Sequence, residues 1–180
     1  MKLAGYAARY NSWTTIGGQF MEMVAPGAFS EALKRGDDVR ALFNHDANIV
    51  LGRTKSGTLK LREDDKGLHY EVELNPADPI AAGVGARVAR RDVTGSSFHF
   101  DLHPDDDEWY PPSKPGGLPQ RVLRRLGLVD VSPVTFPAYE AASVYAGRTG
   151  MSPREQTELL RLRLEIEKAR AWEPARRKER

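Results

Sequence analysis

Ser97 is the side chain in this sequence whose surroundings best suit nucleophilic chemistry. Hydrolysis by a serine needs a hydroxyl, a base that takes its proton, and a third group that orients the base. In the apolar segment 94–102, strand alternation places Phe98 toward the core and Ser96 on the same side. Ser97 and His99 then lie on the opposite face, where Ser97 is the better exposed nucleophile. The alternative is a plain strand with polar residues on its outer face.

His45 is the candidate base. It follows Phe43 and Asn44 at the end of an apolar segment, where a sheet can hold a side chain while solvent still reaches it. A neutral imidazole near pH 7 accepts a proton readily. The alternative is a turn histidine with no special role.

Asp130 is the candidate orienting acid. Alternation puts its carboxylate on the face opposite Val129 and Val131, so its alternative role is that of a solvent-facing strand residue. Glu140 is the competing acid, but it follows a proline-containing segment and is expected in a loop.

The other ionisable residues favour structural roles. The acidic run 105–108 could attract a divalent cation, but it lacks the spacing of a calcium loop and is expected to be a solvated loop. His69 lies between apolar strand residues, and His103 has no evident partner. The absence of cysteine excludes a thiol nucleophile and sulfur-ligated zinc. We therefore predict neither a metal nor another cofactor.

Short strands dominate the elements that must position these residues. Apolar alternation and turn residues predict strands over 3–10, 18–24, 39–44, 58–62, 68–74, 94–102 and 121–131. A short helix should end at Gly36, and Asp78 followed by proline should begin an amphipathic helix over 79–90. Segment 104–120 should be an exposed loop, and the chain should leave the sheet from Pro133. The pattern predicts an α+β fold, a mostly antiparallel β-barrel with flanking helices.

The C-terminal segment differs from the body in pattern and charge. Ser152 and Glu155 fit a capping box, and we predict a basic amphipathic helix within a separate segment 149–180, after a domain over 1–148. This helix should dock on a partner, on another copy or on its own domain. Its apolar stripe comprises Leu159, Leu162, Ile166 and Ala169.

Charge and hydropathy narrow the classes of partner. The 180-residue chain carries a net charge of +2, of which residues 151–180 contribute +3 and residues 1–150 contribute −1. The charge distribution therefore argues against a nucleic-acid partner, because only the tail is basic. No apolar run is long enough to span a bilayer, and the N-terminus lacks a signal-peptide pattern. The protein is expected to remain in the compartment where it is made.

Several stretches in order resemble the prohead proteases of tailed phages, the serine proteases that mature capsids and are similar to herpesvirus assemblin proteases. The resemblance covers about residues 3–148. The matching stretches are 5–7, 22–29, 42–46, 51–53, 67–68, 95–100 and 128–139.

The resemblance implies a role for each candidate residue. His45 matches the family's histidine, Ser97 matches the serine of its Ser-Phe-Gly-Phe pattern, and Asp130 matches a position that is usually glutamate. His99 replaces the usual glycine and could join the proton network or narrow the groove. Because herpesvirus relatives use a second histidine, His99 or His103 is an alternative third member.

The resemblance also implies a fold, a substrate and a location. It implies a herpesvirus-protease-like barrel that cleaves the major capsid or scaffold protein, and itself, by acyl-enzyme chemistry. Self-association as a homodimer or larger assembly would be in keeping with the herpesvirus relatives. The site of action would be the host cytoplasm, inside the immature capsid. The alternative is a non-catalytic scaffolding or interaction module on the same fold.

Overall fold

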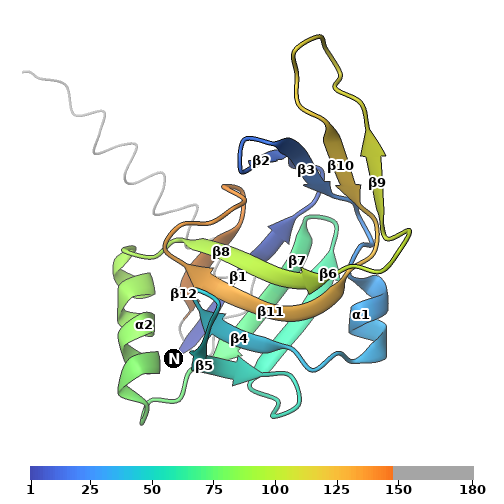
Figure 1. Cartoon of the computed structure of the whole chain (residues 1–180). Coiled ribbons are helices and arrows are strands. Elements are labelled where there is room, and N and C mark those ends of the chain that lie inside the picture. Colours follow the sequence, from blue (N-terminus) through green and yellow to red (C-terminus); the bar gives the residue numbers. More distant parts are fainter. Residues whose placement is uncertain (148–180) are drawn as a thin grey trace, which may run out of the picture. The chain divides into compact units, whose positions relative to one another are not determined.

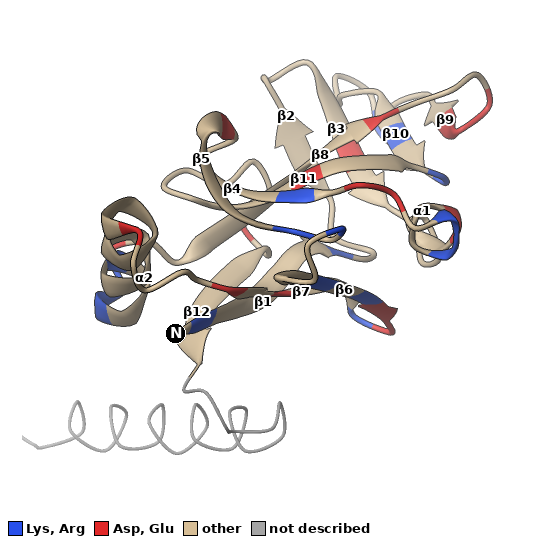
Figure 2. Ribbon diagram, turned by 90° about the horizontal axis from the view of Figure 1, so that it is seen from below, with Lys and Arg blue, Asp and Glu red and all other residues tan. Residues whose placement is uncertain are grey.

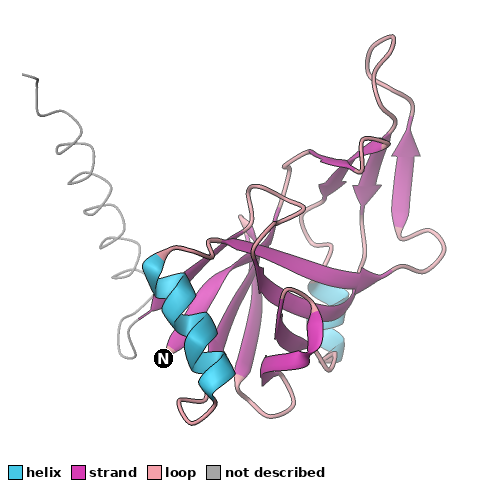
Figure 3. Cartoon of the chain, turned by 60° about the vertical axis from the view of Figure 1, so that its left-hand side comes forward, coloured by secondary structure: helices cyan, strands magenta, loops and turns pink. Residues whose placement is uncertain are grey.

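The protein is described here by a computed structural model, which covers residues 1–147. Within these residues twelve strands and two helices follow one another along the chain (Figure 1). The strands divide into three sheets of four strands each, and the helices lie on opposite sides of them (Figure 3).

The first sheet has the order β12-β1-β7-β6. It contains β1 (Lys2–Arg9), β6 (Leu59–Asp64), β7 (Gly67–Glu73) and β12 (Ser143–Gly147). The β6–β7 hairpin closes at a pairing of Asp64 with Gly67, as the turn residues between them predict.

The second sheet has the order β2-β3-β10-β9 and extends away from the rest of the fold (Figure 1). It contains β2 (Thr14–Ile16), β3 (Phe20–Val24), β9 (Asp107–Tyr110) and β10 (Gln120–Leu123). Strand β10 is parallel to β3 and antiparallel to β9, so it joins two parts of the chain that are far apart in sequence.

The third sheet carries most of the candidate site. Its order is β5-β4-β11-β8, from β4 (Arg40–Phe43), β5 (Asp46–Arg53), β8 (Gly95–Asp101) and β11 (Gly127–Val134). Strand β11 is parallel to β4 and antiparallel to β8.

Local sequence signals account for both helices. Helix α2 (Pro79–Arg90) begins where Asp78 Oδ1 accepts a hydrogen bond of 2.8 Å from Ile80 N. Its inner face repeats every three or four residues and buries Ala81, Val84 and Val88. Helix α1 (Ser30–Arg35) ends at Gly36, whose φ of 72° is the left-handed cap that glycine adopts easily.

One hydrophobic core joins the three sheets. Phe98 of β8 packs edge-to-face on Phe29, with ring centroids 5.4 Å apart, and lies 5.7 Å from the ring of Tyr139. Burying side chains of this size contributes about 1.5–3 kcal/mol each. Because Phe98 faces the core, its neighbour Ser97 projects from the other side of β8.

The barrel expected from the sequence is not found. The strands of residues 1–147 form three separate sheets, and hydrogen bonding closes none of them into a barrel. Closure requires each edge strand to find a partner far away in sequence, and apolar alternation carries no information on that pairing. The mostly β architecture with two helices is confirmed.

Several local predictions also differ from the structure. Strands β2, β5 and β12 were not expected, β9 lies within the predicted loop 104–120, and the predicted strand 121–131 is split between β10 and β11. Pro133 stays within β11 instead of leading the chain out of the sheet. The predicted tail helix and segment 149–180 lie outside the described residues. In residues 1–147, neither helix has the length and apolar character needed to cross a membrane.

Candidate active site

His45 lies in a two-residue turn that joins β4 to β5. Phe43 pairs with Asp46 across the hairpin, and the two residues between them, Asn44 and His45, have φ angles of 53° and 58°. Positive φ at both central residues is the geometry that matches the twist of a hairpin. Asparagine and histidine are both among the non-glycine residues that adopt this region more often than others, and non-glycine residues at positive φ concentrate at functional sites.

The turn is fastened to the end of β11. Asn44 N donates to the Pro133 carbonyl at 3.0 Å, and Thr135 N donates to Asn44 Oδ1 at 2.8 Å. Asn44 Nδ2 also donates to Thr135 Oγ1 at 3.3 Å. These bonds hold the hairpin tip against the strand that carries Asp130, although the two segments are far apart in sequence.

Asp130 is a buried carboxylate at the centre of the site. Its Oδ1 accepts hydrogen bonds of 2.7 Å from His45 Nδ1 and from Ser132 Oγ. Its Oδ2 lies 3.7 Å from His99 Nδ1, beyond hydrogen-bond distance. The side chain is only 3% exposed, whereas that of His45 is 34% exposed. Burial of a carboxylate is costly without such donors, so they account for its position.

Ser97 lies on the same face of the sheet as Asp130. In the β8–β11 ladder Ser97 pairs with Ser132, and His99 pairs with Asp130. Side chains of paired residues project to the same face, with β-carbons about 5 Å apart. The opposite parity of Ser96 is confirmed, since its buried hydroxyl lies 2.8 Å from Tyr70 Oη in the core.

The Ser97 hydroxyl is not held by another group. Within residues 1–147 it makes no hydrogen bond, to His45 or to any other residue, and the residue is largely buried, with 9% of its surface exposed. A hydroxyl that is not held by another group is free to turn toward a base or a substrate.

The structure separates the other candidates from this centre. Glu140 is exposed in the loop after β11, and His103 is exposed just after β8. Within residues 1–147, neither forms a hydrogen bond or an ion pair with His45. His69 is buried in β7, 5.2 Å from the ring of Tyr6, and burial together with the charge of Arg62 lowers its pKa. His69 therefore lies in the protein interior, apart from the centre around Asp130.

The acidic run 105–108 is not the freely solvated loop that was expected. Asp106 is buried and pairs with Arg125 at 3.0 Å, Asp107 pairs with Arg121, and Glu108 with Arg124. Acidic residues of β9 thus face basic residues at β10 and just after it (Figure 2). Asp106, Asp107 and Glu108 thus each have a cationic partner from the protein itself, whereas Asp105 is exposed.

Comparison with known protein families assigns this chain to one of them. Residues 1–157 match the model of the family described as Caudovirus prohead serine protease. The chain belongs to the caudovirus prohead serine protease family. The prohead protease of Enterobacteria phage HK97 is 31% identical over 145 residues, which are 79% of this chain and 58% of that protein. The chain thus spans little more than half the length of that relative.

Two solved herpesvirus proteases are more distant. The Kaposi's sarcoma herpesvirus protease, in complex with an allosteric inhibitor, is 14% identical with a TM-score of 0.46, and the match covers 89% of this chain and 87% of that one. The varicella-zoster virus protease is 14% identical with a TM-score of 0.38, covering 91% and 76%. At these values neither likeness assigns a role to a residue of this family member.

Sequence analysis of this prohead protease family member did not identify three residues that hold the side chains around Asp130 in place. They are Asn44 and Thr135, which fasten the hairpin, and Ser132, which donates to Asp130. Ser132 carried one signal, because it lies two residues after Asp130 and therefore on the same strand face. The contact of Asn44 with Thr135 joins residues 91 positions apart and leaves no local pattern.

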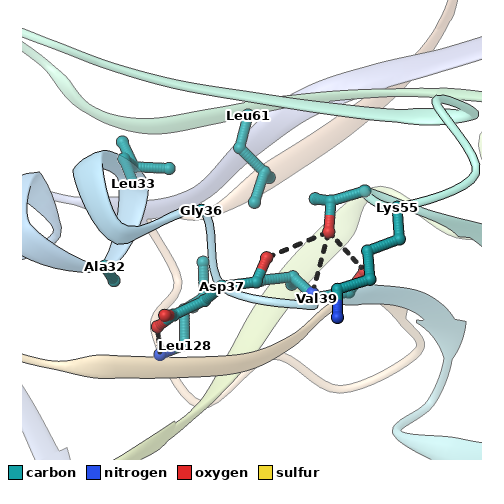
Figure 4. Close-up of a pocket in the computed structure, with 9 residues that line it drawn as sticks. Ala32, Leu33, Gly36, Asp37, Val39, Lys55, Leu61 and Leu128 are labelled. Carbon is teal, nitrogen blue, oxygen red and sulfur yellow. Dashed lines mark hydrogen bonds between the residues drawn. The ribbon is translucent and has the colours of Figure 1, made fainter.

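A pocket of about 270 Å³ lies elsewhere on this family member, beside α1 (Figure 4). Leu33, Leu61 and Leu128 give it an apolar lining, with Asp37 and Lys55 beside them. The Thr54 hydroxyl is already hydrogen-bonded to the backbone: it accepts from Val39 N and donates to the Asp37 carbonyl, each at 3.0 Å. None of the four candidate site residues lines the pocket, so it is separate from the centre around Asp130.

Proposed function

We propose that this chain is a serine endopeptidase that acts in prohead maturation, with Ser97 as nucleophile, His45 as general base and Asp130 as orienting acid. The observation that carries the proposal is the 2.7 Å hydrogen bond between His45 and buried Asp130, on the sheet face that presents the Ser97 hydroxyl. Family membership supports the same reaction class.

The hydrogen bond selects a useful tautomer of His45. When Nδ1–H donates to Asp130 Oδ1, the lone pair of the neutral ring is at Nε2, which is the nitrogen left for Ser97. Asp130 then stabilises the imidazolium that forms when His45 accepts a proton. Ser132 holds the same carboxylate oxygen, so the acid cannot turn away from the ring.

The reaction would proceed in two halves. Ser97 Oγ attacks the peptide carbonyl carbon while its proton passes to His45 Nε2, which gives a tetrahedral intermediate. Collapse breaks the C–N bond, His45 returns the proton to the departing amine, and an ester to Ser97 remains. Water, deprotonated by His45, then attacks the ester and releases the acid product and the free serine.

The substrates we propose are the major capsid or scaffold protein and the chain itself, inside the immature capsid. The relative named prohead protease in phage HK97 supports this assignment. Extended protein segments are suitable substrates because the candidate nucleophile projects from a β-strand, beside which an extended segment can lie.

Co-expression with the cognate capsid and scaffold proteins tests the proposal by intact-mass analysis. Wild type should yield discrete cleavage products, and Ser97→Ala should yield none while its melting temperature stays unchanged. Ser113→Ala, which removes the same atom from an exposed loop serine, should cleave as wild type does. Assembled shells that contain only uncut chains with the wild-type protein would instead favour the non-catalytic assembly module.

A further inference from the structure

A polar groove lies between the segment leading into β2 and the loop that follows β11. Its volume is about 640 Å³. Figure 1 shows the orange loop after β11 beside the blue segment at β2, two parts of the chain more than a hundred residues apart. The groove is lined by residues 12–15 on one side and by Pro137, Ala138, Glu140 and Ala141 on the other.

The groove has fixed walls. Thr14 Oγ1 donates to the Ala138 carbonyl at 2.9 Å and so joins the two sides. Tyr139, in the middle of the loop, is buried and donates its hydroxyl to Glu22 Oε1 at 2.6 Å. Ala142 N donates to the Tyr139 carbonyl at 3.0 Å and closes a turn around Glu140. The loop therefore presents Glu140 from an anchored position.

The groove begins close to the proposed nucleophile. A β-carbon at Gly95 would lie 2.7 Å from Pro137 Cγ, so the proline ring occupies the face of β8 above Gly95. Gly95 and Ser97 share that face, since they are two residues apart in a regular ladder. At about 3.3 Å per residue, Pro137 packs against β8 about 7 Å from Ser97. A substrate strand bound at Ser97 would reach the groove within about three residues.

The chemistry of the lining is suited to a cation. Glu140 is the only charged residue among those that line the groove, and its side chain is exposed. Trp13 also lines the groove and is 39% exposed, and an indole is the best aromatic partner for a cation. We infer that this groove is a substrate subsite that binds a lysine or arginine side chain within three residues of the bond that is cut.

This inference rests on the proposed protease function, and a cleavage-site profile tests both together. The full chain is incubated with peptides prepared from a denatured bacterial proteome, and cut sites are read by mass spectrometry. Wild type should enrich lysine and arginine at one fixed position. Glu140→Gln should abolish that enrichment, and Glu140→Lys should shift it toward aspartate and glutamate. Cuts that depend on Ser97 but show no basic preference, or a preference unchanged in Glu140→Gln, overturn the subsite.

A binding measurement separates the subsite from catalysis. Labelled alanine–serine peptides carrying one lysine at successive positions are titrated into Ser97→Ala, with norleucine as the uncharged control of similar length. The best lysine peptide should bind about fivefold more tightly than its control, the size expected for an exposed ion pair with an aromatic contact. The difference should vanish in Ser97→Ala/Glu140→Gln. Lysine preference in this assay, combined with no cleavage by the wild-type protein, would leave a cation-binding groove and refute the protease, whereas equal binding of the lysine and norleucine peptides would refute the subsite.

Discussion

Asp130 and Glu22 are both buried carboxylates, but their hydrogen-bond partners differ in exposure and in unused hydrogen-bonding capacity. Glu22 accepts hydrogen bonds from Tyr139 at 2.6 Å and from Arg121 at 3.1 Å, and both partners are themselves largely buried. Asp130 is bonded to Ser132, which is buried, and to His45, whose side chain is 34% exposed.

The partners of Glu22 form a closed network. Arg121 also pairs with Asp107 at 2.6 Å, and its guanidinium lies 5.4 Å from the ring centroid of Trp109. Burial, and then the charge of Glu22, raise the pKa of Tyr139, so this phenol stays protonated. Both oxygens of Glu22 and the hydroxyl of Tyr139 are bonded within the network, which links the second sheet to the loop after β11.

The surroundings of Asp130 are open by contrast. Its hydrogen bond to His45 uses one ring nitrogen and leaves the other for a reaction. A buried acid therefore indicates a candidate site only when one of its partners has an accessible group with unused hydrogen-bonding capacity. The two carboxylates should consequently respond to substitution in opposite ways, one in catalysis and the other in stability.

Asp130→Asn should have the largest effect on cleavage. The amide occupies the same volume, but it no longer favours the tautomer of His45 with the proton on Nδ1, nor does it stabilise the imidazolium. We expect the rate of peptide cleavage to fall by about 10³–10⁴-fold, as loss of the triad acid does elsewhere, with a melting temperature close to that of wild type. Asp101→Asn, at the exposed end of β8, is the matched control and should cleave normally. A rate within tenfold of wild type would exclude Asp130 as the orienting acid.

Glu22→Ala should have the largest effect on stability. It leaves Tyr139 without its acceptor and removes one of the two carboxylates that pair with Arg121. The free energy of unfolding, measured by urea denaturation, should fall by about 3 kcal/mol, the lower end for a broken buried pair. Cleavage should persist at temperatures below the transition. Glu31→Ala, at an exposed position of helix α1, should change stability by less than about 0.5 kcal/mol, and a similarly small change for Glu22→Ala would refute the structural role of the network.

The sequence predicted those elements whose signals are local. Helix α2 has the bounds expected from the Asp78 cap and from the spacing of Val84 and Val88. Strand β9 was missed because arginines in and just after the next strand, β10, neutralise its acidic residues, and an acidic run by itself is typical of a solvated loop. The separation into three sheets depends on pairings between segments much farther apart in sequence, such as β3 with β10.

In the candidate site, too, the local features were predictable from the sequence and the long-range contacts were not. Alternation correctly placed Ser96 in the core and so directed attention to Ser97. Asp130 proved to be buried rather than solvent-facing, because His45 and Ser132 supply the donors that its burial requires. The 85 residues between Asp130 and His45 prevented that contact from being derived from spacing alone.

Ser132→Ala should have an intermediate effect, and it should lower both stability and catalysis. The substitution removes a 2.7 Å donor to Asp130 at a fully buried position, which should cost about 1 kcal/mol in unfolding free energy. Because Asp130 then has more freedom to turn, the turnover number should fall by about tenfold, or about 1.4 kcal/mol in the barrier. Urea denaturation and peptide kinetics measure the two quantities on one preparation. A loss of stability without any loss of turnover would show that Ser132 does not position the acid.

His99→Ala should have the smallest effect, and it determines which residue is the third member. The His99 side chain is 61% exposed, and its Nδ1 lies 3.7 Å from Asp130 Oδ2, so the interaction is that of a solvent-screened pair. We expect the turnover number to change by no more than about fivefold. His103→Ala, at the exposed start of the next loop, should leave turnover unchanged. A loss as large as that of Asp130→Asn would instead make His99 the essential partner of His45, because their ring centroids are 6.5 Å apart on the same face of the sheet.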